Sequence, residues 1–155
     1  MTSQLTVSVR DYSEEASSCR LHVPTIDATN HDAVVTSASA LYNAVEDIVD
    51  GIVNKYTLIH SVTKISNVMG SSDVESRRER KMMVQYQDDT TLEVYTVEIP
   101  SPNMSLLTYD GRTDKILLAD TGAMAAFVTA MEANAVSPNG NSITIIGAYV
   151  TGRLL

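Results

Sequence analysis

Apolar and polar residues alternate in several short stretches of the chain, which is the pattern of half-buried β-strands. Residues 5–9 alternate strictly, and residues 19–23 do so again before Pro24 ends the run. Proline ends such a run because it has no backbone N–H for the sheet ladder. These two stretches therefore predict a β-hairpin at the start of the fold.

The clearest periodic signal predicts a helix over residues 30–50. It follows a cluster of residue types that cap helices, and its apolar positions recur every three or four residues. These positions are Val34, Ala38, Leu41, Val45, Ile48 and Ile52. Gly51 stands where a helix end favours a left-handed residue. A second helix is predicted from Asp120 to about Val136, with a buried stripe of Met124, Phe127, Val128, Met131 and Ala135.

Further strands are predicted over residues 53–65, 77–87, 92–99 and 142–149. Asp88, Asp89, Thr90 and Thr91 form the turn of a second hairpin, Pro100 ends its second strand, and residues 114–118 are a candidate short strand. In the last strand we place Ile143 and Ile145 on one face, with Gly147 as a possible third member. Residues 67–76 are rich in Ser, Gly and Asp, so we interpret them as a mobile loop or an interaction arm.

The order ββαβββαβ predicts an α+β fold, with an antiparallel or mixed β-sheet or sandwich and two packed helices. The length of 155 residues fits one structural domain, residues 1–155, and no internal repeat is visible in the sequence.

Composition and charge narrow the classes of function. The formal net charge of −8 is opposite in sign to the basic surface that nucleic-acid binding or adhesion to anionic lipid requires. No apolar stretch approaches the roughly twenty residues that span a bilayer, and the first residues do not resemble a secretory signal. Cys19 is the only cysteine, so we interpret it as a small apolar strand residue of a chain that folds in reducing cytoplasm.

Catalytic motifs are absent from the sequence. His22, His31 and His60 are not spaced as zinc ligands, and the chain has neither a GxSxG elbow nor a glycine-rich phosphate loop. Asp88 and Asp89 could pair as carboxylates for acid–base or metal chemistry, but we favour their interpretation as residues of a hairpin turn, which prefers Asp. Residues 110–114 resemble a calcium loop only faintly. We therefore expect no enzyme activity, no cofactor, and no catalytic or metal-binding residues.

One cluster of cations is a candidate interface. Four of the 11 Lys and Arg residues lie close together: Arg77, Arg78, Arg80 and Lys81. Glu75 and Glu79 could pair with them locally, or the cluster could dock onto the acidic surface of a neighbouring copy.

Six stretches in chain order give the sequence its one family resemblance. They are VRDYS (9–13), RRERK (77–81), VQYQD (84–88), TVEIP (96–100), SPNGN (137–141) and VTGR (150–153). Together they resemble small virion structural proteins of tailed bacteriophages, namely head decoration (cement) proteins and tail-tube subunits. The resemblance implies self-assembly with copies of itself and other virion proteins, as a trimer or hexamer, without a cofactor and without membrane or specific nucleic-acid binding. It implies a location in the virion after folding in the host cytoplasm.

Three hypotheses follow from the sequence. The first is a self-assembling virion subunit, in either the decoration or the tail-tube role, although the long apolar arm of tube subunits is not identifiable. The second is a small protein-binding module or assembly adaptor. The third is a minor hydrolase, which requires Asp88, Asp89 or a histidine to converge in a pocket.

Overall fold

The computed structural model describes residues 2–10, 16–50, 52–62, 80–118 and 122–151. Its elements run in the order β1 (Thr2–Arg10), β2 (Ala16–Pro24), α1 (His31–Ile48), β3 (Ile52–Val62), β4 (Lys81–Asp88), β5 (Val94–Pro100), the 3₁₀ helix η2 (Met104–Leu106), α2 (Ala123–Asn134) and β6 (Ile143–Thr151). The predicted α+β class and element order are confirmed, and every strand pairing is antiparallel.

The strands form two three-stranded sheets with the same topology. The first has the order β2-β1-β3 and the second β5-β4-β6. In each sheet a hairpin is followed by a helix and then by a strand that returns to the first strand of the hairpin. The fold is therefore two ββαβ units, a repeat in topology that the sequence does not reveal.

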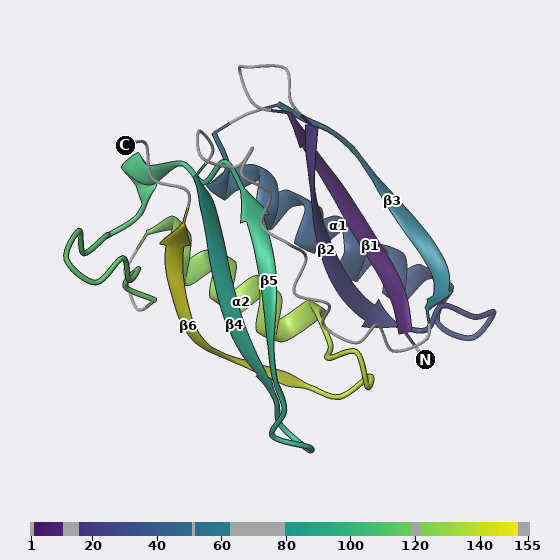
Figure 1. Cartoon of the computed structure of the whole chain (residues 1–155). Helices are drawn as coiled ribbons and strands as arrows, with labels where there is room; N and C mark the ends of the chain where they lie inside the picture. Colours follow the sequence, from purple (N-terminus) through teal and green to yellow (C-terminus); the bar gives the residue numbers. More distant parts are fainter. Residues whose placement is uncertain (1, 11–15, 51, 63–79, 119–121, 152–155) are drawn as a thin grey trace.

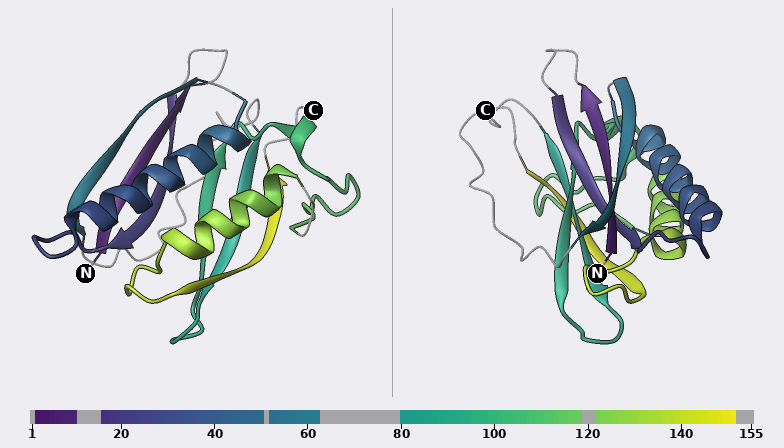
Figure 2. Two further views of the ribbon diagram at one scale, coloured as in Figure 1. Left: turned by 180° about the vertical axis from the view of Figure 1, so that it is seen from behind. Right: turned by 90° about the vertical axis from the view of Figure 1, so that its right-hand side faces the viewer.

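The two sheets lie side by side, and both helices cover the same face of them (Figures 1 and 2). β2 lies beside β5 at the junction of the sheets, and α1 packs against α2 behind it. We call the junction between β2 and β5 the seam. No ladder of backbone hydrogen bonds joins β2 to β5 within the described residues.

The apolar core lies between the sheets and the helix layer. The predicted stripe of α1 is buried from Val34 to Ile48, and Phe127 and Met131 of α2 are buried against it. Met82, Val84 and Tyr86 are buried on one face of β4, as their alternation predicts. Burial of such side chains contributes about 1.5–3 kcal/mol each, so the core supplies most of the folding free energy.

The segments that follow the two helices cross the seam reciprocally. Val136, after α2, donates its N–H to the carbonyl of His22 in β2 at 2.9 Å. Asp50, after α1, donates its N–H to the carbonyl of Ser101, just beyond β5, at 2.7 Å. Each unit is thus tied to the other at one end of the seam, which fixes the two sheets relative to each other.

A β-bulge in β6 changes which side chains face the core. Gln85 of β4 pairs with Gly147, whereas the next residue, Tyr86, pairs with Ile145, so Ile146 is the extra residue. Ile143 and Ile145 are buried before the bulge, and Ala148 and Val150 are buried after it. The suggestion that Gly147 continues the buried face is therefore wrong, because strict alternation ends at Ile146.

Several predicted boundaries differ from the structure. α1 ends with an extended C-cap at Val49, and Gly51 lies outside the described residues. Ile52, assigned to the helical stripe from its spacing, begins β3 instead. α2 is shorter than expected, Ala123–Asn134, with Gly122 as N-cap. Residues 115 and 116 form only isolated bridges, and loop 67–76 lies outside the described residues.

Candidate functional site

The predicted basic cluster is only partly described. Arg77 and Arg78 lie outside the described residues, whereas Arg80 is exposed just before β4. Lys81 lies 2.7 Å from the carboxylate of Glu98 on β5, a half-exposed ion pair across the hairpin. The partner of Lys81 is thus a residue far along the chain, which the local alternative with Glu75 or Glu79 did not anticipate. A pair of this exposure contributes little to stability.

Asp88 is a fully buried carboxylate at the end of β4. Its Oδ2 accepts a hydrogen bond from Ser137 Oγ at 2.6 Å, and Asn139 and Asn141 donate side-chain N–H groups to the same carboxylate. Its Oδ1 accepts the backbone N–H groups of Thr90 and Thr91 at 2.8 and 2.9 Å. Asp88 therefore fixes the β4–β5 turn to loop 137–141.

The pKa of Asp88 is consistent with this structural role. Burial raises the pKa of Asp88, but the hydrogen bonds from Ser137, Thr91, Asn141 and Thr90 lower it by more. The pKa of this carboxyl therefore lies well below its usual range. A carboxylate held ionised by five donors is a poor proton acceptor. Asp89 instead points to the exposed side, where it accepts a hydrogen bond from Thr144 Oγ1 at 2.6 Å. The two carboxylates thus serve separate contacts, which counts against the hydrolase hypothesis.

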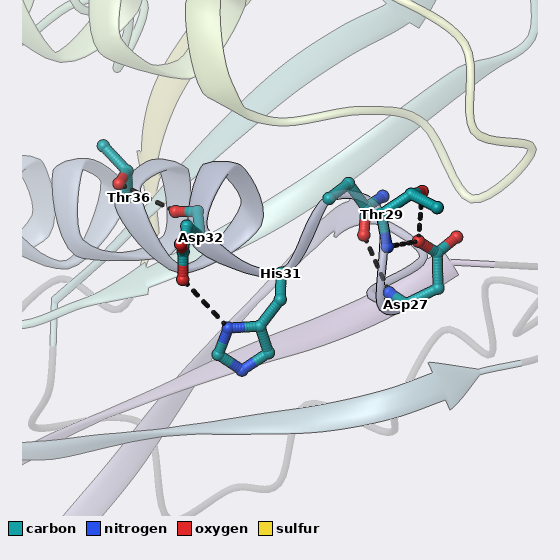
Figure 3. A network of polar contacts seen from close by, with 6 residues as sticks. Asp27, Thr29, His31, Asp32 and Thr36 are labelled. Carbon is teal, nitrogen blue, oxygen red and sulfur yellow. Dashed lines mark hydrogen bonds and ion pairs between the residues drawn. The ribbon is translucent and has the colours of Figure 1, made fainter.

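The histidines occupy unrelated positions. His22 is buried in β2 with Nδ1 2.8 Å from Thr2 Oγ1, and burial lowers its pKa. His31 begins α1, where its exposed ring lies 3.3 Å from the Asp32 carboxylate, as Figure 3 shows. The same figure shows Asp27 accepting the N–H and hydroxyl of Thr29, a turn that leads into the helix. The side chain of His60 lies outside the described residues.

The loop that faintly resembled a calcium site is a pair of local turns. Asp110 Oδ1 accepts the backbone N–H of Arg112 at 2.9 Å, and the hydroxyl of Tyr109 donates to Asp114 at 2.6 Å. The hydrogen bond from Arg112 is the main reason that the pKa of Asp110 is lowered. Within the described ranges no three His, Cys, Asp or Glu side chains gather closely enough to hold a metal ion.

Cys19 is fully buried in β2, as its interpretation as an apolar strand residue predicts. Burial, with a smaller contribution from the charge of Glu98, raises its pKa to about 12. The thiol is therefore protonated at neutral pH and is a poor nucleophile.

The exposed end of the β4–β5 hairpin carries apolar side chains. We call residues 89–94 the hairpin tip, and Figure 1 shows it projecting beyond the rest of the fold. Leu92 is 64% exposed and Val94 is 49% exposed. Leu92 also has a φ of 63°, in the left-handed region where a residue with a Cβ costs about 1–2 kcal/mol relative to glycine. Sequence alternation gave no sign of this conformation.

Hydrogen bonds hold the backbone of the hairpin tip in place. Leu92 donates its N–H to the carbonyl of Asp88 at 2.8 Å, and Gln87 Nε2 donates to the carbonyl of Leu92 at 3.2 Å. Together with the contacts of Asp88 to Thr90 and Thr91, these bonds determine the left-handed backbone at Leu92. The tip is therefore an ordered apolar projection.

A cleft of about 690 Å³ lies along the seam, lined by residues of β2, β4 and β5. Arg20 of β2 and Lys81 and Glu98 of the second sheet line it with charge, and Tyr86 and Val97 add apolar surface. Arg20 is exposed and forms no ion pair with any described residue. The cleft thus has a local excess of positive charge in a chain whose net charge is −8.

The cleft lies between two strand edges, that of β2 and that of β5. In an antiparallel strand, successive residues direct their N–H and C=O groups to opposite sides. The carbonyl of His22 accepts the N–H of Val136 on the side of β2 away from β1. The backbone N–H and C=O of Arg20, two residues earlier, therefore face the same side. The N–H of Asp88 donates to the carbonyl of Glu93 across the hairpin. The backbone groups of Thr96 and Glu98 therefore face away from β4. The backbone N–H and C=O groups of Arg20, Thr96 and Glu98 thus face the seam without a backbone partner among the described residues.

Comparisons with protein-family models, with curated proteins and with solved structures find no significant match for this chain. Across the described ranges, neither helix has the length and apolar character needed to cross a membrane. Evidence for function therefore comes from the residues themselves.

Proposed function

We propose that the protein is a self-assembling structural subunit of a bacteriophage virion, in a capsid decoration (cement) or tail-tube role. Its partners are copies of itself and other virion proteins. Its role is to form protein–protein interfaces rather than to catalyse a reaction, so it needs no cofactor. The particle contains it as a homo-oligomer, a trimer or a hexamer.

The observation that carries this proposal is the ordered apolar projection at the hairpin tip. Leu92 and Val94 are exposed at the end of a hairpin whose backbone is fixed by buried Asp88. Exposing large apolar side chains costs solubility unless a partner covers them. Specific interfaces are built from such apolar groups on an ordered backbone, because little entropy is then lost on binding.

Further exposed apolar residues support the same proposal. Ile146 stands out from the bulge of β6, and Leu106 and Leu117 are exposed in the segment between β5 and α2. All belong to the second ββαβ unit. A stable interface removes at least about 1,000 Å² from water, which requires several such groups together. The resemblance in sequence to virion structural proteins directs the proposal to a phage particle.

Negative-stain electron microscopy of the purified protein tests the proposal. Rings or stacked rings would support a tube subunit, whereas compact trimers that bind to undecorated phage capsids would support a decoration protein. Free particles of monomer size that bind neither capsids nor tails would refute both roles.

The seam cleft favours a second candidate function, a protein-binding module or assembly adaptor. The outward N–H and C=O groups of Arg20, Thr96 and Glu98 could pair with an extended segment of another protein, as in β-strand addition. A pull-down that yields one heterologous partner at fixed stoichiometry, from a protein that stays monomeric alone, would favour this function over self-assembly.

A further inference from the structure

Loop 137–141 contains an asparagine that is followed directly by a glycine. Asn139 is half-buried, and Gly140 is exposed with a φ of 85°. In such a pair the backbone nitrogen of the glycine can attack the side-chain carbonyl carbon of the asparagine, because glycine has no Cβ to obstruct the approach. Asparagine is one of the thermolabile residue types. The pair is therefore a candidate site of spontaneous deamidation.

This reaction needs water but no enzyme and no oxidant. The nitrogen of Gly140 gives its proton to solvent base and forms a bond to Cγ of Asn139. The bond from Cγ to Nδ2 then breaks, and ammonia leaves with a proton taken from solvent. Water opens the resulting cyclic imide to an aspartyl or an isoaspartyl residue. In sum, an amide and water are converted into a carboxylate and ammonium.

Hydrogen bonds of the folded loop engage both reacting groups. The N–H of Gly140 donates to the carbonyl of Ser137 at 2.8 Å, so this nitrogen is part of a β-turn. Nδ2 of Asn139 donates to the hydroxyl oxygen of Tyr95 at 3.1 Å and to Oδ2 of Asp88 at 3.3 Å. Both groups must leave these bonds before the imide ring can close, because attack requires the nitrogen and Cγ to be positioned for each other.

The two acceptors of Nδ2 are also poor sources of the proton that departing ammonia needs. Tyr95 donates its hydroxyl proton to Glu93 Oε2 at 2.5 Å. Asp88 is ionised, because its hydrogen bonds hold its pKa well below the usual range. The folded structure thus surrounds a reactive pair with groups that keep it from reacting.

We propose that Asn139 is a latent deamidation site, which stays unreacted while loop 137–141 is bonded to the β4–β5 hairpin and reacts when that contact opens. Loops open locally at a lower free energy than global unfolding, so the native protein exposes the site from time to time. The product places a carboxylate beside that of Asp88, where an amide donor stood before. Two carboxylates this close repel each other. Deamidation is therefore a one-way change that loosens the hairpin tip.

Mass spectrometry of the purified protein, incubated at pH 8 and then digested, measures the reaction. Replacement of NH₂ by OH raises the mass of the fragment, and sequencing of the fragment distinguishes Asn139 from Asn141. Asn139 should react at least about tenfold faster in urea than in the native protein, since the protective bonds are then lost. Asn141 precedes a serine, so in the unfolded chain it should react more slowly than Asn139.

Two variants remove the acceptors of the Asn139 amide. Tyr95→Phe removes the hydroxyl and keeps the ring, and Asp88→Ala removes the carboxylate. Each should speed the native reaction several-fold while far-UV circular dichroism shows a folded chain. Tyr95→Phe decides the question if Asp88→Ala does not fold. Asp89→Asn is the matched control, because this exposed carboxylate bonds to β6 instead and its loss should leave the rate unchanged.

Two further variants test the product and the chemistry. Asn139→Asp reproduces the aspartyl product, and beside Asp88 it should lower the equilibrium constant for folding by about tenfold or more at neutral pH in urea unfolding. Gly140→Asn keeps a residue that tolerates a φ of 85°, and a Cβ there lies 3.9 Å from Thr2 Cγ2, an ordinary contact. Its side chain should slow the reaction at Asn139 in urea several-fold.

Each part of the proposal can fail separately. Equal rates at Asn139 in the native and the unfolded chain would overturn it, because the bonds would then give no protection. An unfolded chain that reacts no faster at Asn139 than at Asn141 would show that the pair is not a reactive site. If folded Tyr95→Phe and Asp88→Ala react like the wild type, the hairpin does not protect the amide. If Asn139→Asp is as stable as the wild type, the reaction does not loosen the tip.

Discussion

Replacing Asp88 tests how the hairpin tip is held in position. In Asp88→Ala, the hydroxyl of Ser137 loses its acceptor in a fully buried site. The side chains of Asn139 and Asn141 lose the same acceptor in a partly buried site. Hydrogen bonds to a charged group contribute about 1.5–3 kcal/mol each, but the exposed N–H groups of Thr90 and Thr91 can bond to water instead. We therefore expect a loss of about 3 kcal/mol in the free energy of unfolding.

Asp88→Asn should cost less, about 2 kcal/mol, because the amide oxygen can still accept from the turn while its NH₂ group opposes the donors of Asn139 and Asn141. The control is Asp89→Asn, since this neighbouring carboxylate is exposed and contacts only Thr144 in the described fold. That change should stay within about 0.5 kcal/mol.

The cost of Asp88→Asn should also depend on pH. The folded pKa of Asp88 lies below its unfolded value, because the hydrogen bonds outweigh the effect of burial. The unfolded chain therefore binds a proton first as the pH falls, so the stabilisation is complete above about pH 5 and is lost progressively below that pH. The difference between wild type and variant should shrink over the same range.

Urea unfolding followed by far-UV circular dichroism measures these quantities at one fixed protein concentration, because assembly would shift the apparent stability. At neutral pH, Asp88→Ala should also lower Tm by roughly 6–12 °C in a chain of this size. Equal stability of the Asp88→Asn and Asp89→Asn variants would show that the buried carboxylate does not hold the turn. A difference from wild type that stays constant from pH 7 to pH 3 would refute it as well.

Three further outcomes follow from the fold. Cys19, whose pKa burial raises to about 12, should react with a thiol reagent at pH 8 only after unfolding, as mass spectrometry of the labelled chain would show; fast labelling of the folded protein would contradict its burial. His22 should titrate below pH 6.5 in NMR, and because its folded pKa is lowered, its protonation should reduce stability as the pH falls below that value; a midpoint above 6.5 would contradict this. Ile145→Ala should cost about 2–4 kcal/mol in urea unfolding and Ile146→Ala less than about 0.5 kcal/mol, and the reverse order would place the bulge elsewhere.

The sequence predicted the elements well because their patterns are local. The three-and-four spacing from Val34 to Ile48 and the alternation around Val84 depend only on which face each side chain buries. Boundaries were less accurate where a spacing continued by chance, as at Ile52, which fits the helical stripe yet begins β3. The bulge at Ile146 was not visible because an extra residue is defined by its partner strand.

The candidate site was harder to predict from the sequence than the elements. Asp88 was interpreted correctly as a turn residue, but its contacts with loop 137–141 join residues about fifty positions apart. The ion pair of Lys81 with Glu98 and the seam between β2 and β5 depend on register and topology, which no short motif encodes. The left-handed Leu92 departs from the usual preference for glycine, so only the fold could show it.

Self-assembly is measured most simply as the mass of the purified wild-type protein in solution. Size-exclusion chromatography with light scattering, repeated over a hundredfold range of concentration, reports this mass. We expect an oligomer of about 50 or about 101 kDa, three or six times the chain mass of 16.8 kDa, that dissociates on dilution or in high salt. A mass of 16.8 kDa at every concentration would contradict it.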